Sequence, residues 1–211
     1  MVEHTKTFYR DTTEFEGRTI NIQGPVTHEE LKGYDFHEGL TAFRPPEQQY
    51  KALLSIAQLP EARIIVSLDG HMIVAYVTFL YPDPLERWSE EKMEDLLELG
   101  AIEVAPPYRN IGLAKRMLQV AFRDDAMEDY IVISTEYYWH WDLKGTGLSV
   151  WEYRKVMEKV MGSVGLTWFA TDDPEICSHP ANCLMARIGK RVPMSSIEKF
   201  DRMRFKRRFM Y

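Results

Sequence analysis

One segment of the chain, residues 101–127, constrains the fold more than any other. It begins with the apolar run 101–105, which is typical of a buried strand, and continues through a turn that contains a single glycine, Gly112. The residues after the turn carry apolar side chains at helical intervals on one face. The segment therefore predicts a strand that leads through a tight turn into a helix packed on a core.

The turn has the composition of an anion-binding loop. The first backbone N–H groups of a helix have no partner within the helix, and the helix dipole places partial positive charge there. Gly112 leaves room for a ligand to approach the backbone, and Arg109, Lys115 and Arg116 add full positive charge. We therefore expect this turn to bind a phosphate group.

Length and charge exclude several other classes of protein. A chain of 211 residues with 45% hydrophobic residues can bury one sizeable core, so we expect a single globular domain. The net charge of -6 argues against general nucleic-acid binding, and no apolar run approaches the roughly 20 residues that span a bilayer. Two cysteines, Cys177 and Cys183, and a start without a signal peptide favour the cytoplasm.

Periodicity and turn residues predict the other elements in chain order. They are a helix that begins at Thr27, a helix over 46–59, a hairpin of strands 63–68 and 72–80 around Asp69-Gly70, a strand over 130–135, a helix over 150–161, a strand over 166–171, a short helix over 180–188 and a last edge strand over 202–206. This order predicts an α+β fold with a mixed sheet flanked by helices.

The spacing Arg109-x-x-Gly112-x-Ala114 resembles the coenzyme A pyrophosphate loop of the GCN5-related N-acetyltransferase (GNAT) superfamily, (Gln/Arg)-x-x-Gly-x-(Gly/Ala). The resemblance implies the acyl-CoA acyltransferase fold, with a central, mostly antiparallel sheet, and acetyl-CoA as the co-substrate. It implies one domain over 1–211 with an insertion at 136–150 and a C-terminal extension at 172–211. The residues that it assigns to acetyl-CoA binding are Val104, Arg109, Asn110, Ile111, Gly112, Leu113, Ala114 and Lys115.

Residues 40–46, 81–88, 135–142 and 170–175 are similar to the acetoin utilization acetyltransferases of Gram-positive bacteria. This closer resemblance implies transfer of an acetyl group to a lysine of acetyl-CoA synthetase, which inactivates that enzyme. Two alternatives remain: acetylation of a small amine, and a regulatory module that senses coenzyme A without turnover. An intact loop together with two glutamates on the adjacent strand favours catalysis.

The two glutamates, Glu98 and Glu103, are candidates for the general base. A lysine amine has an ordinary pKa of roughly 10.4, so a base must remove a proton before the amine attacks a thioester. The family places its base eleven positions before the Arg of the loop, at Glu98. Glu103 is slightly preferred, because an unpaired carboxylate in mid-strand is expected to have a raised pKa. Either could instead form a structural ion pair or lie in solvent.

The proton donor to the departing thiolate is less well defined. Two alignments of the family's tyrosine-bearing helix lead to Met185 or to Tyr153, and Tyr153 is favoured, with Tyr137 and Tyr138 nearby. The aromatic stretch 137–141 is either a docking surface for a protein or packing beneath a loop. Cys177, His179 and Cys183 lack the spacing of a zinc site, so no metal is expected.

Overall fold

The computed structural model describes residues 3–209, which form two compact units. The first unit contains residues 3–80 and 99–127, and the second contains residues 81–98 and 128–209. Strand β6 (Leu96–Val104) contributes its first three residues to the second unit and the remaining ones to the first. The expectation of a single domain stays a prediction. None of the described helices is long and apolar enough to cross a membrane.

The first unit is built on a sheet with the strand order β1-β2-β4-β5-β6. Neighbouring strands from β1 to β5 pair antiparallel, and the short β3 pairs parallel with β5. The hairpin predicted around Asp69-Gly70 is confirmed as β4 and β5. The bounds are β1 (Tyr9–Phe15), β2 (Arg18–Gly24), β3 (Asp35–Phe36), β4 (Arg63–Asp69) and β5 (Met72–Leu80).

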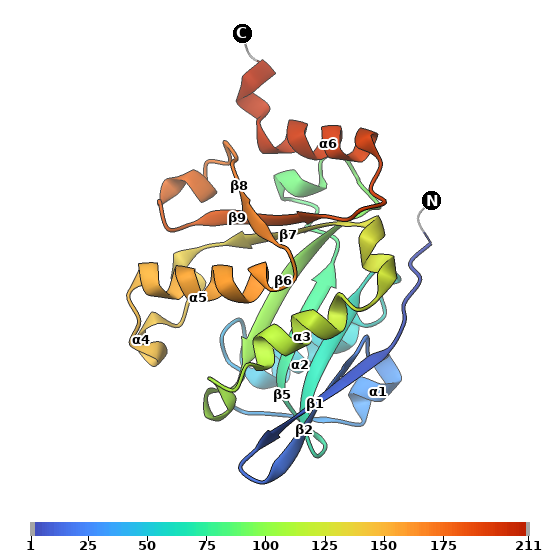
Figure 1. The fold of residues 1–211 in the computed structure, drawn as a ribbon, viewed down its shortest axis with the longest axis vertical. Helices are drawn as coiled ribbons and strands as arrows, with labels where there is room; N and C mark the ends of the chain where they lie inside the picture. The colour runs from blue at the N-terminus through green and yellow to red at the C-terminus, as the bar shows by residue number, and fades with distance from the viewer. Residues whose placement is uncertain (1–2, 210–211) are drawn as a thin grey trace. The chain divides into compact units, whose positions relative to one another are not determined.

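Helices cover both faces of this sheet. On one face α3 (Leu113–Ala121) runs across β2, β4 and β5 (Figure 1). The ring of Phe79 from β5 packs edge-on against Phe122, just after α3. On the other face Tyr76 of β5 packs on Phe36, which contacts Tyr50 of α2 (Pro46–Ile56). The predicted helix start at Thr27 is confirmed, because Thr27 and Glu30 form a capping box at α1 (His28–Lys32).

The second unit has the strand order β6-β7-β9-β8. Strands β6 and β7 (Ile131–Glu136) pair parallel, whereas β9 (Cys183–Ile188) pairs antiparallel with both β7 and β8 (Thr167–Phe169). Helix α5 (Val150–Gly162) contacts β8, and α6 (Met194–Arg204) contacts the 3-10 turn η1 (Arg87–Ser89). The shorter helical elements of the chain are η2 (Pro106–Tyr108), η3 (Asp125–Asp129), η4 (Tyr138–His140), α4 (Leu143–Thr146), η5 (Ile176–Ser178) and η6 (Lys206–Phe209).

The core of the second unit lies between its strands and the helical segments η1 and α6. Trp88 from η1 packs on Phe200 from α6, with ring centroids 6.2 Å apart. The buried apolar residues of this core are Trp88, Met93, Leu96, Ile131, Ile133, Ile176, Leu184, Ala186, Val192, Phe200 and Met203. The two units together give the mixed, mostly antiparallel sheet with flanking helices that the sequence predicts.

Two of the predicted elements have a different secondary structure. Residues 180–188 are not a helix, because residues 183–188 form β9, which pairs along its length with β7. A short apolar run of Leu, Met and Ala suits a helix by propensity, but pairing with two strands overrides that preference. Residues 202–206 are not an edge strand: residues up to Arg204 end helix α6, whose buried Phe200 and Met203 have helical spacing.

Candidate active site

The predicted phosphate loop lies in the first unit, between the end of β6 and the start of α3. Asn110 (φ 68°) and Gly112 (φ 80°) both have left-handed backbone conformations, which asparagine and glycine tolerate best. Gly112 is the N-cap of α3 and has no side chain to bind the first N–H groups of the helix. A Cβ at Gly112 would meet no protein atom within 4 Å, so the loop leaves open space beside its backbone. These features fit a pyrophosphate.

The charges that were assigned to the loop have different surroundings. Arg109 donates from Nε to the carbonyl oxygen of Val104 at 3.3 Å, which ties the loop to the end of β6. Lys115 is exposed on the first turn of α3. Arg116 instead donates to Asp11 of β1 at 3.0 Å, so part of its charge is compensated. Arg109 and Lys115 stay candidates for a phosphate, with Lys115 the exposed cation of the two.

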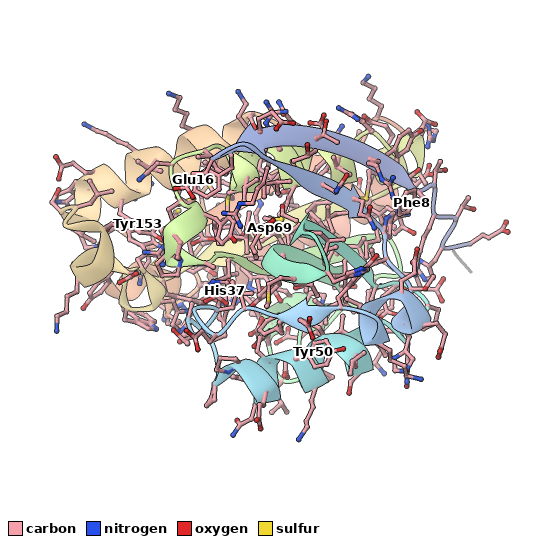
Figure 2. The ribbon with its side chains drawn as sticks, turned by 90° about the horizontal axis from the view of Figure 1, so that it is seen from below. Phe8, Glu16, His37, Tyr50, Asp69 and Tyr153 are labelled. Carbon is pink, nitrogen blue, oxygen red and sulfur yellow. The ribbon has the colours of Figure 1, made fainter. Side chains whose placement is uncertain are left out.

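The residue just before the loop, Tyr108, is anchored by its neighbours in the first unit. Its hydroxyl donates to Asp69 at 2.7 Å, and its ring lies edge-on to the imidazole of His37; Asp69 and His37 are labelled in Figure 2. Desolvation and the Asp69 carboxylate raise the pKa of Tyr108. The loop thus begins from a fixed point, which preorganises its backbone.

Glu103 on β6 is buried, and both oxygens of its carboxylate accept a hydrogen bond. Its Oε1 accepts the backbone N–H of Ala42 at 2.7 Å, and its Oε2 accepts the hydroxyl of Tyr76 at 2.8 Å. Burial and the Glu103 carboxylate raise the pKa of Tyr76, so the phenol remains a donor. The expectation that Glu103 is an unpaired charge is wrong, because two donors stabilise its carboxylate and fix the loop before α2.

Glu98 lies on the part of β6 that belongs to the second unit. It has the raised pKa that was expected of Glu103. Burial, followed by the carboxylate of Glu86, raises the pKa of Glu98 to about 7. Glu136 and Asp83 act in the same direction, while the hydroxyl of Thr135 donates to Glu98 at 3.1 Å and opposes the shift. A carboxyl group with a pKa near neutral pH is suited to general base chemistry.

The candidate acid Tyr153 lies on α5 in the second unit (Figure 2). It is half-buried, and its ring stacks on Trp141 with centroids 5.1 Å apart. The indole Nε1 of Trp141 donates to Glu136 at 3.0 Å, which fixes the stack. The alternative position, Met185, is a buried residue of β9 and has no ionisable proton.

The aromatic stretch is neither wholly buried nor wholly exposed. Trp141 is buried, but 46% of Trp139 is exposed. Cys177 is exposed, whereas Cys183 is buried in β9, and burial raises the pKa of the Cys183 thiol to about 12. Within residues 3–209, no three His, Cys, Asp or Glu side chains form a group that could hold a metal ion.

Sequence reasoning missed three side chains that shape these surroundings. Tyr76 holds Glu103, and Thr135 and Glu86 act on Glu98. A tyrosine inside the apolar run 72–80 was a usable signal, because a buried phenol requires a hydrogen-bond partner. Glu86 and Thr135 gave no such signal, since their effect depends on strand pairing and loop packing.

Comparison with known proteins agrees with this architecture. The pattern of the acetyltransferase (GNAT) family matches residues 28–136, just over half of the chain. The chain is 62% identical over 210 residues to the acetoin utilization protein AcuA of Bacillus subtilis (strain 168), and the match covers 100% of both sequences.

Solved structures show the same relationship. The crystal structure of an acetoin utilization protein from Exiguobacterium sibiricum 255-15 matches with a TM-score of 0.95 at 56% identity, over 98% of each chain. A GNAT superfamily phosphinothricin acetyltransferase from Sinorhizobium meliloti, solved in complex with AcCoA, matches with a TM-score of 0.52 at 13% identity, over 81% of this chain and 89% of that chain. The second likeness shows the fold alone.

The family pattern and the full-length relatives lead to the same conclusion. The chain belongs to the acetyltransferase (GNAT) family, as an N-acetyltransferase related over its whole length to the acetoin utilization proteins AcuA.

Proposed function

We propose that this N-acetyltransferase transfers the acetyl group of acetyl-CoA to the side-chain amine of a lysine in acetyl-CoA synthetase, and thereby inactivates that enzyme in acetoin and acetate metabolism. The raised pKa of Glu98 is the observation that carries the proposal, because it supplies a base suited to a protonated amine at neutral pH. The identity of the acceptor rests on the relationship to the acetoin utilization proteins.

The donor side is supported by the loop after β6. In this proposal the backbone N–H groups from Asn110 to Lys115 and the side chains of Arg109 and Lys115 hold the pyrophosphate of acetyl-CoA. The open space beside Gly112 and the free start of α3 support the assignment. The main chain of Val104 lies next to the thioester by its position in the family pattern, where an N–H polarises the carbonyl oxygen.

Glu98 acts as the general base. It takes a proton from the lysine ammonium, and the neutral amine then attacks the thioester carbon. The new C–N bond forms, the C–S bond breaks, and the attacking nitrogen releases its second proton to solvent to give the neutral amide. The sulfur leaves as a thiolate that takes up a proton to become the free thiol. Tyr153 is the proposed donor of that proton. Glu103 is a positioning residue, because Ala42 and Tyr76 already occupy its carboxylate oxygens.

The surroundings of Glu98 favour a cationic acceptor. Asp83 and Glu86 are exposed carboxylates whose charges act on Glu98. Their negative potential attracts a protonated amine and concentrates it near the base. A neutral or anionic small molecule gains nothing from this potential. This negative potential supports a lysine side chain and a small cationic amine equally as the acceptor. The experiment must therefore distinguish the two acceptors.

The test incubates the purified protein with labelled acetyl-CoA and the acetyl-CoA synthetase of the same organism. We expect label on one lysine of the synthetase by mass spectrometry, together with loss of synthetase activity in proportion to labelling. A catalytically impaired Glu98→Gln variant is the control. Labelled small amines with an unlabelled synthetase would support the small-amine alternative. Tight acetyl-CoA binding without transfer to either acceptor would support the sensor alternative.

A further inference from the structure

The second unit carries three tryptophans at its surface. Of the five tryptophans of the chain, all within residues 3–209, Trp88 and Trp141 are buried. The exposed fractions of Trp139, Trp151 and Trp168 are 46%, 50% and 58%. Large aromatic side chains are usually buried, and exposed tryptophans are enriched at the centres of protein interfaces. None of the three has a role in the proposed chemistry.

The imidazole of His179 connects these aromatic side chains. Its ring lies 4.2 Å from the ring of Tyr138 and 6.5 Å from that of Trp151, centroid to centroid. Tyr138 in turn contacts Trp139 at 5.4 Å, and Trp139 stacks on Tyr137 at 4.9 Å. The rings therefore form one continuous surface, which we call the aromatic surface: Tyr137, Tyr138, Trp139, Trp151 and His179.

Hydrogen bonds fix the segments that carry the aromatic surface. The backbone N–H of Tyr138 donates to the side chain of Asn182 at 3.0 Å, and the N–H of Ala181 donates to Nδ1 of His179 at 3.1 Å. Arg154, one turn beyond Trp151 on α5, donates to the carbonyl oxygen of Pro180 at 2.8 Å. The surface is thus held in place before any partner arrives, which lowers the entropic cost of binding.

A cavity lies beside this surface. It has a volume of about 360 Å³, and Arg154, Trp168, Phe169, Ile176 and His179 are among the residues that line it. A cavity of this size next to exposed rings accepts an apolar side chain from a partner. Such anchor pockets are typical of protein interfaces.

Negative charge borders the aromatic surface on the side of Tyr137. Burial and the carboxylates of Glu175, Asp173 and Glu86 raise the pKa of Tyr137. The exposed carboxylates near it are those of Asp83, Glu86 and Glu175. Partial burial and repulsion from neighbouring carboxylates raise the pKa of Glu86. Two arginines of this region are already paired: Arg87 with Asp172 and Asp173, and Arg154 with Glu158. A cationic partner would relieve the repulsion.

We propose that the aromatic surface, with Glu86 and Glu175 beside it, docks a basic segment of the protein substrate that carries lysine or arginine together with an apolar anchor residue. The charge complementarity selects this occupant, because cations bind both to carboxylates and to the faces of indole rings. The inference rests on the proposed function and deepens it, since it names the chemistry of the substrate segment that lies outside the acceptor lysine.

The experiment measures steady-state acetylation of acetyl-CoA synthetase and of a small acceptor, Nα-acetyl-lysine amide, by the full chain. We expect Trp139→Ala and Trp151→Ala each to raise KM for the synthetase about 10-fold with kcat unchanged. Acetylation of the small acceptor and the affinity for acetyl-CoA should remain at the wild-type values. The charge reversal Glu175→Lys, at a carboxylate that does not act on Glu98, should raise KM for the synthetase and weaken its dependence on salt.

Phe8→Ala is the matched control, because Phe8 is exposed to the same extent as Trp139, 46%, but belongs to the first unit. It should leave KM for the synthetase unchanged. A wild-type KM in both tryptophan variants would overturn the docking proposal while leaving the proposed function intact. Tryptophan variants that convert a dimer to a monomer at wild-type KM would instead assign the surface to a second copy of this chain. No labelling of the synthetase by the wild type would overturn the proposed function itself.

Discussion

Two glutamates on one strand have different environments, and this difference underlies the roles that we propose for them. Each carboxylate oxygen of Glu103 accepts one hydrogen bond from a protein donor. Glu98 accepts one, from Thr135, and lies among other carboxylates that oppose its ionisation. The principle used with the sequence, that a buried carboxyl with a raised pKa makes the better base, is sound. Applied to the structure, it favours Glu98 over Glu103 as the proposed base.

Glu98→Gln is expected to lower kcat by at least about 100-fold while leaving the affinity for acetyl-CoA unchanged, because the amide cannot accept the proton. In the wild type, kcat/KM should rise with pH to a plateau with a midpoint of about 7, since the deprotonated carboxylate is the active form. Steady-state assays from pH 5.5 to 9 measure kcat and kcat/KM, and calorimetry measures the affinity for acetyl-CoA.

Two controls accompany this prediction. Thr135→Val should move the midpoint upward, because the lost hydroxyl favours the charged carboxylate. Glu103→Gln should keep the wild-type midpoint and lose stability, through the disturbed contacts with Ala42 and Tyr76. If Glu103→Gln rather than Glu98→Gln abolishes the pH dependence, the base assignment is wrong.

At the scale of elements, local signals were sufficient wherever they were strong. Three predicted features depend only on residues close together in the chain, and all three are confirmed: the capping box at Thr27, the Asp69-Gly70 hairpin and the apolar face of α3. Strand β1 was missed because its side chains alternate only between partial and full exposure, which resembles a polar loop. Strand β2 was missed although Ile20 and Ile22, two positions apart, are buried in it and give a short period-two signal. Strand β9 was misjudged because its identity comes from pairing with β7. The raised pKa of Glu98 is equally non-local.

Gly112→Val tests the role of the turn between β6 and α3. We expect acetyl-CoA binding to fall below detection by calorimetry, because the side chain fills the open space beside the loop backbone. Gly17→Val is a matched control in the β1–β2 turn: Gly17 also has a left-handed φ, 74°, and a Cβ there also meets no atom within 4 Å. Both variants pay a similar cost of about 1–2 kcal/mol in stability. Equal acetyl-CoA affinities for the two would reject the loop assignment.

At the scale of the whole molecule, the phosphate loop and the surroundings of Glu98 carry charges of opposite sign. The first unit carries the cationic residues of the loop, Arg109 and Lys115, whereas the second gathers the carboxylates that act on Glu98. The net charge of -6 therefore conceals a basic loop suited to a phosphate and an acidic region suited to an amine. Composition argued against nucleic acid as a general ligand class but could not reveal this local separation of charge.

The stability of the whole chain should depend on pH through Glu98. Its folded-state pKa of about 7 lies above the ordinary value of 4.5, so the folded protein binds more protons between these values and loses stability as pH rises through them. Glutamine does not titrate. Glu98→Gln should therefore match the wild type near pH 4.5 and be more stable above pH 7, by at most about 3 kcal/mol in urea unfolding. A stability difference that does not change with pH would contradict the raised pKa.

Strand β6 belongs to both units, and this limits how its length can change in evolution. It carries Glu98 on its second-unit part and Val104 on its first-unit part, next to the loop. Side chains alternate between the two faces of a strand, so inserting or deleting one residue between these positions turns one of them to the opposite face. We therefore expect substitutions between Glu98 and Val104 to be tolerated better than single-residue insertions or deletions. The number of residues between Glu98 and Val104 thus determines whether the two positions share a face of the strand.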